Sequence, residues 1–143
     1  MKPPLATKKL ILLAVSAAAL ALSGGAIAAD SMLKLSGEQE VPPVTSTASG
    51  TGTITVAADG AVSGSVTTTG ITATMAHIHM APSKGANGPV IVPLTQSSPG
   101  VWSVPAGAKL TPEQLKAYQD GLLYVNVHSS EHKAGEIRAA LMP

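Results

Sequence analysis

The stretch Gly52-Thr53-Ile54-Thr55-Val56, followed by Asp59-Gly60 and then by Val62-Ser63-Gly64-Ser65-Val66-Thr67, decides the fold class. Apolar and polar residues alternate with period two in both runs, as they do in strands that bury one face. Asp-Gly between two such runs is a strong hairpin signal. We therefore predict a β-hairpin here.

Further short extended segments surround this hairpin. Six more candidates lie between Gly- and Pro-marked turns: residues 32–35, 71–80, 90–94, 101–104, 122–127 and 136–141. About eight short strands at regular spacing favour an antiparallel sandwich or barrel over a parallel α/β sheet. The core is expected to be aliphatic, because the chain has no Phe, one Trp and two Tyr.

One helix is expected among the strands. Thr111-Pro112-Glu113-Gln114 has the form of a capping box with Pro at the first helical position. Gly121 is suited to end the helix, because Gly readily adopts the left-handed conformation after a helix C-terminus. The pattern predicts a short helix over residues 112–120, before the penultimate strand.

Residues 1–28 have the layout of a cleavable signal peptide. A flank with three lysines precedes an apolar run at residues 10–22, and Ala26-Ile27-Ala28 supplies the small residues of a cleavage site. The run is shorter than the ~20 residues that cross a bilayer. We expect a periplasmic or secreted protein, without a membrane anchor after cleavage, whose single domain spans residues 29–143.

Cleavage changes the charge balance of the chain. The remaining residues include six basic and eight acidic side chains, a net charge of −2, and Arg138 is the single arginine. Neither a basic stripe nor a set of stacking aromatic residues is present, so the composition does not support nucleic-acid binding. The absence of Cys excludes both disulfides and a lipoprotein anchor.

The four histidines fall into two groups. His77 and His79 are two residues apart, so in a strand their imidazoles share a face about 6.5 to 7 Å apart. His128 follows the predicted strand 122–127 and supplies a third imidazole if that strand end lies beside the first pair. His132 follows a polar turn and is the weakest candidate. Three neutral imidazoles suit Cu(II), Zn(II) or Ni(II).

Two methionines sharpen the choice of metal. Met75 has the parity of His77 and His79, and Met80 has the opposite parity but directly follows them. Thioethers favour Cu(I), so copper in either oxidation state is the expected cofactor, with zinc as the alternative. The competing interpretation is that Met75 packs in the core. The candidate metal ligands are His77, His79, His128, His132, Met75 and Met80.

Motifs in a fixed order resemble the CHRD domain, a family named for chordin that includes single exported bacterial proteins. They are Gly37-x-x-Glu40-Val41-Pro42-Pro43-Val44, Ala76-His77-Ile78-His79, Gly85-Ala86-Asn87-Gly88-Pro89-Val90, Leu110-Thr111 with Gln114, Leu123-Tyr124-Val125-Asn126-Val127-His128 and Gly135-Glu136-Ile137-Arg138. The resemblance covers about residues 33 to 142. It implies an immunoglobulin-like antiparallel β-sandwich.

Three polar residues near these motifs are candidates for supporting roles. Asn126 shares the parity of His128, Glu136 can orient a ligating imidazole, and Arg138 can attract an anion toward a metal. The alternative is ordinary pairing with charges on a neighbouring strand.

Three classes of function remain open. The favoured one is an exported copper-binding protein that buffers the ion or exchanges it with a donor or acceptor protein. The second is an enzyme, because a His-x-His strand with a later histidine resembles the copper site of copper-zinc superoxide dismutases, although their Cys pair is missing. The third is an adhesion or protein-binding module without metal. No arrangement for hydrolysis or group transfer is present, so a non-catalytic role is preferred.

Overall fold

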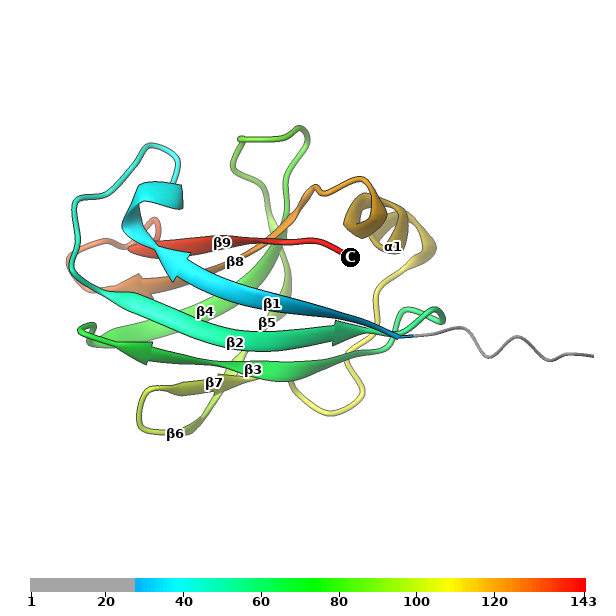
Figure 1. Cartoon of the computed structure of the whole chain (residues 1–143), viewed down its shortest axis with the longest axis horizontal. Helices are drawn as coiled ribbons and strands as arrows, with labels where there is room; N and C mark the ends of the chain where they lie inside the picture. The colour runs from blue at the N-terminus through cyan, green and yellow to red at the C-terminus, as the bar shows by residue number, and fades with distance from the viewer. Residues whose placement is uncertain (1–27) are drawn as a thin grey trace, which may run out of the picture.

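The computed structural model describes residues 28–143, which form nine strands, a 3-10 turn and one α-helix (Figure 1). The predicted signal peptide lies outside the described residues, apart from Ala28, and stays a prediction. The elements are β1 (Ala29–Ser36), η1 (Gly37–Gln39), β2 (Ser49–Val56), β3 (Val62–Thr69), β4 (Ala73–Met80), β5 (Val90–Pro93), β6 (Thr95–Ser98), β7 (Val101–Ser103), α1 (Pro112–Gln119), β8 (Leu123–Ser129) and β9 (Ile137–Leu141).

The strands form one antiparallel sheet in the order β5-β4-β8-β9-β1-β2-β3-β7-β6, which curls into a nearly closed barrel (Figure 1). The two halves of the sheet meet at β1. This strand pairs with β2 along its whole length but with β9 only at Ser36 opposite Arg138. The predicted all-β antiparallel class, with a short helix before the penultimate strand, is confirmed. The structure has one continuous sheet, whereas the family resemblance implied an immunoglobulin-like sandwich.

The predicted hairpin is confirmed as β2 and β3. The two strands pair from Ser49 opposite Thr69 to Val56 opposite Val62. Gly60 in the turn has a φ of +89°, which Gly adopts at no steric cost. The inward residues of the hairpin join a core that is mostly Leu, Ile and Val, as the composition predicts.

Most strand ends differ from the predicted ones by one to three residues, and two differences matter for the sheet and the site. The missed strand is β6, whose Thr95-Gln96-Ser97-Ser98 sequence is exposed throughout and lacks alternation. It forms the edge of the sheet beside β7, where only one neighbour is needed. Strand β8 continues to Ser129 instead of ending at residue 127, so His128 lies inside the strand.

Helix α1 begins and ends close to the predicted positions. The capping box is present, with Thr111 accepting from the Gln114 amide and the Gln114 side chain accepting from the Thr111 amide. Gly121 follows the helix with a φ of +73°. The Tyr118 hydroxyl lies 3.2 Å from the Ser31 hydroxyl, which ties α1 to β1. No helix in the described part of the chain is long and apolar enough to span a membrane.

Strand β8 is buried on both of its faces. Val125 and Val127 point into the barrel core, so the alternate residues of the strand point to the outer face. That face lies under loops: Asn87 donates to the Val41 carbonyl at 2.7 Å and accepts from Arg138 at 2.8 Å. The loops thereby bury a row of polar side chains outside the barrel.

Candidate metal centre

Strands β4 and β8 bring three of the four histidines together. They pair antiparallel, with Met75 opposite His128, His77 opposite Asn126, and His79 opposite Tyr124. The predicted neighbourhood of His128 and the His77-x-His79 pair is therefore confirmed. His128 lies diagonally across from His77, on the outer face of the sheet.

The nitrogen atoms of the three imidazoles converge. His77 Nδ1 lies 3.0 Å from His128 Nε2, and one ligand atom from each of His77, His79 and His128 falls within 4.8 Å of the other two. Nitrogen ligands about 2.0 to 2.1 Å from one ion lie about 3 Å apart when the angle between them is near 90° to 100°. The 3.0 Å between His77 Nδ1 and His128 Nε2 is a hydrogen-bond distance, and it also matches the spacing of two ligands on one metal.

Backbone carbonyls fix the orientation of two of the rings. His79 Nδ1 lies 2.8 Å from the Gly88 carbonyl, and His128 Nδ1 lies 2.8 Å from the Lys133 carbonyl. A carbonyl only accepts, so both Nδ1 atoms donate and both Nε2 atoms carry the lone pair in the neutral ring. His79 Nε2 is buried and has no hydrogen-bond partner among the described residues. This orphaned lone pair suits a metal, since ligating histidines commonly donate their second nitrogen to a carbonyl.

The local environment favours the neutral form of His77 and His79. Burial, followed by the proximity of His128 and His79, lowers the pKa of His77 to about 4. Burial also lowers the pKa of His79, although the hydrogen bond to the Gly88 carbonyl acts in the opposite direction. Metal ligation requires neutral imidazole, so both rings are ready to bind without losing a proton at neutral pH.

A known protein family matches the part of the chain that holds the histidine cluster. The family model described as CHRD domain matches residues 33–141, which is most of the chain. The chain belongs to the CHRD domain family. The resemblance drawn from the sequence motifs is thus confirmed, and the three clustered histidines lie within the matched region. No curated protein and no solved structure is significantly similar to the chain.

A stack of side chains holds one ring of the CHRD domain's histidine cluster. The rings of His79 and Tyr124 are parallel within 3°, with centroids 4.8 Å apart. The guanidinium carbon of Arg138 lies 3.4 Å from the Tyr124 ring centroid. The Tyr124 hydroxyl also accepts from the Gly88 amide at 3.0 Å. Cation–π contacts such as that of Arg138 with Tyr124 contribute about 0.5 to 2 kcal/mol and hold the tyrosine in place. The tyrosine ring in turn restrains His79, which is stacked on it.

Glu40 and Asn126 are buried beside the cluster. Glu40 Oε1 and Asn126 Oδ1 have no hydrogen-bond partner within residues 28–143. Burial raises the pKa of Glu40, although the charge of Arg138 and hydrogen bonds from Asn126 and Val41 oppose this. A Cβ at Gly135 would lie 2.4 Å from Asn126 Nδ2 and 2.5 Å from Glu40 Oε1, so only Gly fits there. Asn126 lies opposite His77, and its side-chain amide donates to the Ala134 carbonyl at 3.4 Å, so its supporting role at the histidines stays a prediction.

The remaining candidate ligands lie outside the three-histidine cluster. Met75 is about half exposed on the same strand face as His77 and His79. Met80 packs against the core. His132 lies in the turn after β8, where its amide donates to the Ser129 hydroxyl. The structure therefore gathers His77, His79 and His128 but not His132 or Met80.

Glu136 does not contact a ligating imidazole. Ser46 donates to its carboxylate at 2.7 Å. Burial acts to raise the pKa of Glu136, but hydrogen bonds from Ser129 and Ser46 and the charge of His132 bring the pKa below its usual value. Glu136 therefore accepts from serine hydroxyls, whereas the alternative considered from the sequence was pairing with charges on a neighbouring strand.

Sequence reasoning missed Tyr124 and the carbonyls of Gly88 and Lys133. The parity of Tyr124 with Asn126 and His128 was the available signal for the tyrosine. The carbonyls had no such signal, because every residue carries one and only loop geometry decides where it points.

The lowered pKa of His77 predicts that the metal-free protein loses stability on acidification. A histidine in an unfolded chain has a pKa near 6.5, whereas the pKa of His77 in the folded protein is about 4. Between these pH values the unfolded state therefore binds more protons than the folded state. The free energy of unfolding therefore falls as the pH decreases from about 7 to about 4. His79 acts in the same direction. After discounting for solvent screening at partly exposed His77, we expect its share to be about 1 kcal/mol.

Thermal unfolding of the metal-free protein at several pH values between 7 and 4.5 measures this effect. The His77→Gln variant should lose less stability than the original protein over the same range. Carboxylates titrate in both proteins, so the difference isolates His77. If the stability of the two proteins falls equally with decreasing pH, the result contradicts a lowered pKa of His77 in the folded protein.

Proposed function

We propose that this CHRD-domain protein is an exported copper-binding protein that buffers or delivers the ion. The observation that supports this most is the convergence of three imidazoles, two of them oriented by backbone carbonyls. The donors His77, His79 and His128 would hold the metal from the outer face of the sheet. The fourth coordination position is left to solvent or to an exchanging ligand.

The donor set favours copper over other metals. The cluster includes neither a carboxylate nor a thiolate, which disfavours Mg²⁺ and Ca²⁺, and it lacks the carboxylate of the common two-histidine iron site. Among the divalent ions that suit imidazole, Cu²⁺ binds most tightly at a given site. Zinc is the main competitor, because three histidines and water also form a tetrahedral zinc site.

Met75 supplies a further reason to choose copper. It lies opposite His128 and two residues from His77, on the same strand face. Its side chain is about half exposed. A thioether beside three imidazoles extends the site to Cu(I), which a buffer or carrier must also hold. Met80, which faces the core, is not part of this proposal.

The exported location rests on the sequence. A basic flank, a short apolar run and Ala26-Ile27-Ala28 are typical of a cleaved signal peptide. A periplasmic or extracellular site would meet copper together with the donor or acceptor protein that exchanges it. The N-terminus of the native protein, read by mass spectrometry, should be Ala29 or Asp30.

Metal analysis of protein purified from its native exported fraction tests the proposal. We expect about one copper per chain, since reconstitution alone would load copper onto almost any histidine cluster. Zinc in the native protein, or no metal, would overturn the choice of copper.

The Met75→Leu variant should weaken Cu(I) binding about tenfold and Cu(II) binding little, whereas the control Met80→Leu should change neither. Equal Cu(I) affinity in both variants would remove Met75 from the site.

A copper-only superoxide dismutase is the second candidate function. His77 is only partly buried, so a small substrate can approach the metal, and three protein ligands leave a position open. Rapid superoxide consumption by the copper-loaded protein, abolished in His79→Ala and unaffected by Met75→Leu, would make superoxide dismutation the favoured function. Slow consumption supports storage or delivery.

A further inference from the structure

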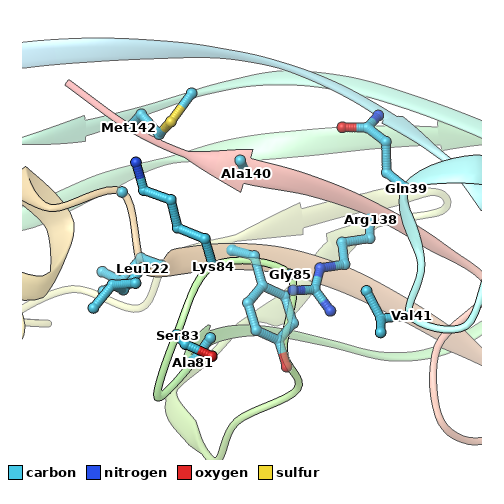
Figure 2. Close-up of a pocket in the computed structure, with 13 residues that line it drawn as sticks. Gln39, Val41, Ala81, Ser83, Lys84, Gly85, Leu122, Arg138, Ala140 and Met142 are labelled. Carbon is cyan, nitrogen blue, oxygen red and sulfur yellow. The ribbon is translucent and has the colours of Figure 1, made fainter.

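A pocket of about 330 Å³ lies beside the histidine cluster, between the loop after β4 and the outer face of β9 (Figure 2). Its walls include Tyr124, Arg138 and Lys84, and none of the three clustered histidines lines it. Tyr124 lies between the pocket and the histidine cluster, because its ring contacts both Arg138, which lines the pocket, and His79, which belongs to the cluster. The pocket is therefore a neighbour of the proposed metal centre and not a part of it.

The lining of this pocket holds two cations, Lys84 and Arg138, and no carboxylate. Within residues 28–143, the ion pairs present join Lys109 to Asp59 and Lys116 to Asp120, so Lys84 is in none of them. Figure 2 shows the Lys84 ammonium near Met142 and the Arg138 guanidinium near Val41.

Within residues 28–143, no carboxylate lies at ion-pair distance from the buried Arg138, although the Glu40 carboxylate is near enough for the charge of Arg138 to lower its pKa. The Arg138 side chain is 6% exposed, and its two hydrogen bonds go to neutral acceptors, the Asn87 side-chain oxygen at 2.8 Å and the Ala86 carbonyl at 2.9 Å. Guanidinium has five N–H donors, so three are not used by these bonds. A desolvated cation with spare donors favours an incoming carboxylate or similar anion.

The rest of the lining is mostly apolar. Val41, Leu122, Ala140 and Met142 contribute to it. A Cβ at Gly121 would lie 3.4 Å from Met142 Sδ and 3.6 Å from Lys84 Cε, so the Lys84 methylenes run close to the methionine and lengthen the apolar wall. The volume is at the small end of ligand pockets, which span about 300 to 1,000 Å³.

We propose that this pocket binds a small organic anion, a carboxylate carried on an apolar body about one ring in size. The carboxylate pairs with Arg138, Lys84 adds a second positive charge to the lining, and the apolar body packs against Leu122, Ala140 and Met142. This inference does not depend on a metal at the three histidines.

Fluorescence titration of the metal-free full chain with anilinonaphthalene sulfonate tests the proposal, because the probe combines an anion with aromatic rings. Phenylpropionate should displace the probe at a concentration at least tenfold lower than its neutral analogue phenylpropanol. The displacement should weaken at high salt, since charge attraction at an open site is screened. Equal displacement by the acid and the alcohol would overturn the anionic character of the ligand.

Two variants locate the binding. Lys84→Glu, at an exposed position, should weaken probe binding at least tenfold, and Ala140→Trp should remove it by filling the pocket. Lys109→Glu makes the same charge change at a distant site and should leave the affinity within twofold of the original. Unchanged binding in Lys84→Glu would refute the proposal even if Ala140→Trp does not fold. Lys84→Glu should also keep its copper affinity, which separates this site from the metal centre.

Discussion

Replacing His77, His79 or His128 singly with Ala is expected to weaken copper binding at least tenfold. Each replacement removes one of three converging imidazoles, and two ligands hold the ion less tightly and in a less defined geometry. Competition with a chromophoric chelator measures the dissociation constant for each variant. Circular dichroism before titration shows whether each variant is folded.

His132→Ala is the matched control for this series. His132 lies in the turn after β8 and outside the cluster, so its loss should change the copper affinity less than threefold. If His77→Ala and His128→Ala both keep the original affinity, the three imidazoles do not form one site. If His132→Ala weakens copper binding as much as His79→Ala does, the site instead extends to the turn.

Gly88→Ala is expected to disturb both the loop and the metal centre. A Cβ at this position would lie 1.9 Å from the Met80 carbonyl oxygen, which belongs to the backbone and cannot move alone. The loop must shift, and the Gly88 contacts to His79 and Tyr124 are then lost. We expect a loss of about 2 to 3 kcal/mol in the free energy of unfolding. Copper affinity should fall about 10- to 100-fold, as for other partners of ligating histidines.

Gly107→Ala separates steric crowding from the general effect of replacing Gly. Gly107 has a φ of +81°, and a Cβ added at this residue would meet no other atom within 4 Å. Alanine there meets only backbone strain, about 1 kcal/mol, and lies far from the histidines in the sequence. Its copper affinity should be unchanged. If Gly88→Ala and Gly107→Ala behave alike in unfolding and in copper titration, the Gly88 carbonyl does not orient His79.

The two predictions test different parts of one arrangement. The histidine variants remove donors, whereas Gly88→Ala leaves every donor in place and alters the direction of the His79 ring. A normal affinity in Gly88→Ala together with weak binding in His79→Ala would mean that the stack with Tyr124 and Arg138 alone holds the ring.

Local sequence patterns predicted the elements that depend on neighbouring residues. Alternation in residues 52–67 predicted the β2–β3 hairpin, and Thr111 with Gln114 predicted the start of α1. The spacing of His77 and His79 predicted their common face, because side chains alternate in any strand whatever its partners. The polar edge strand β6 has no alternation and was missed, since its exposure removes the apolar signal.

The sequence by itself thus determined the antiparallel β class, the capped helix and the pair of imidazoles on one strand face. Only the tertiary structure decided that β8 lies beside β4 with Met75 opposite His128, which brings the third imidazole to the pair. It also decided that the two halves join through β1 and β9, and that Gly88 and Lys133 aim carbonyls at the rings. Strand periodicity follows from the local geometry of the backbone, whereas strand pairing and loop direction depend on the burial and hydrogen bonding of residues far apart in the chain.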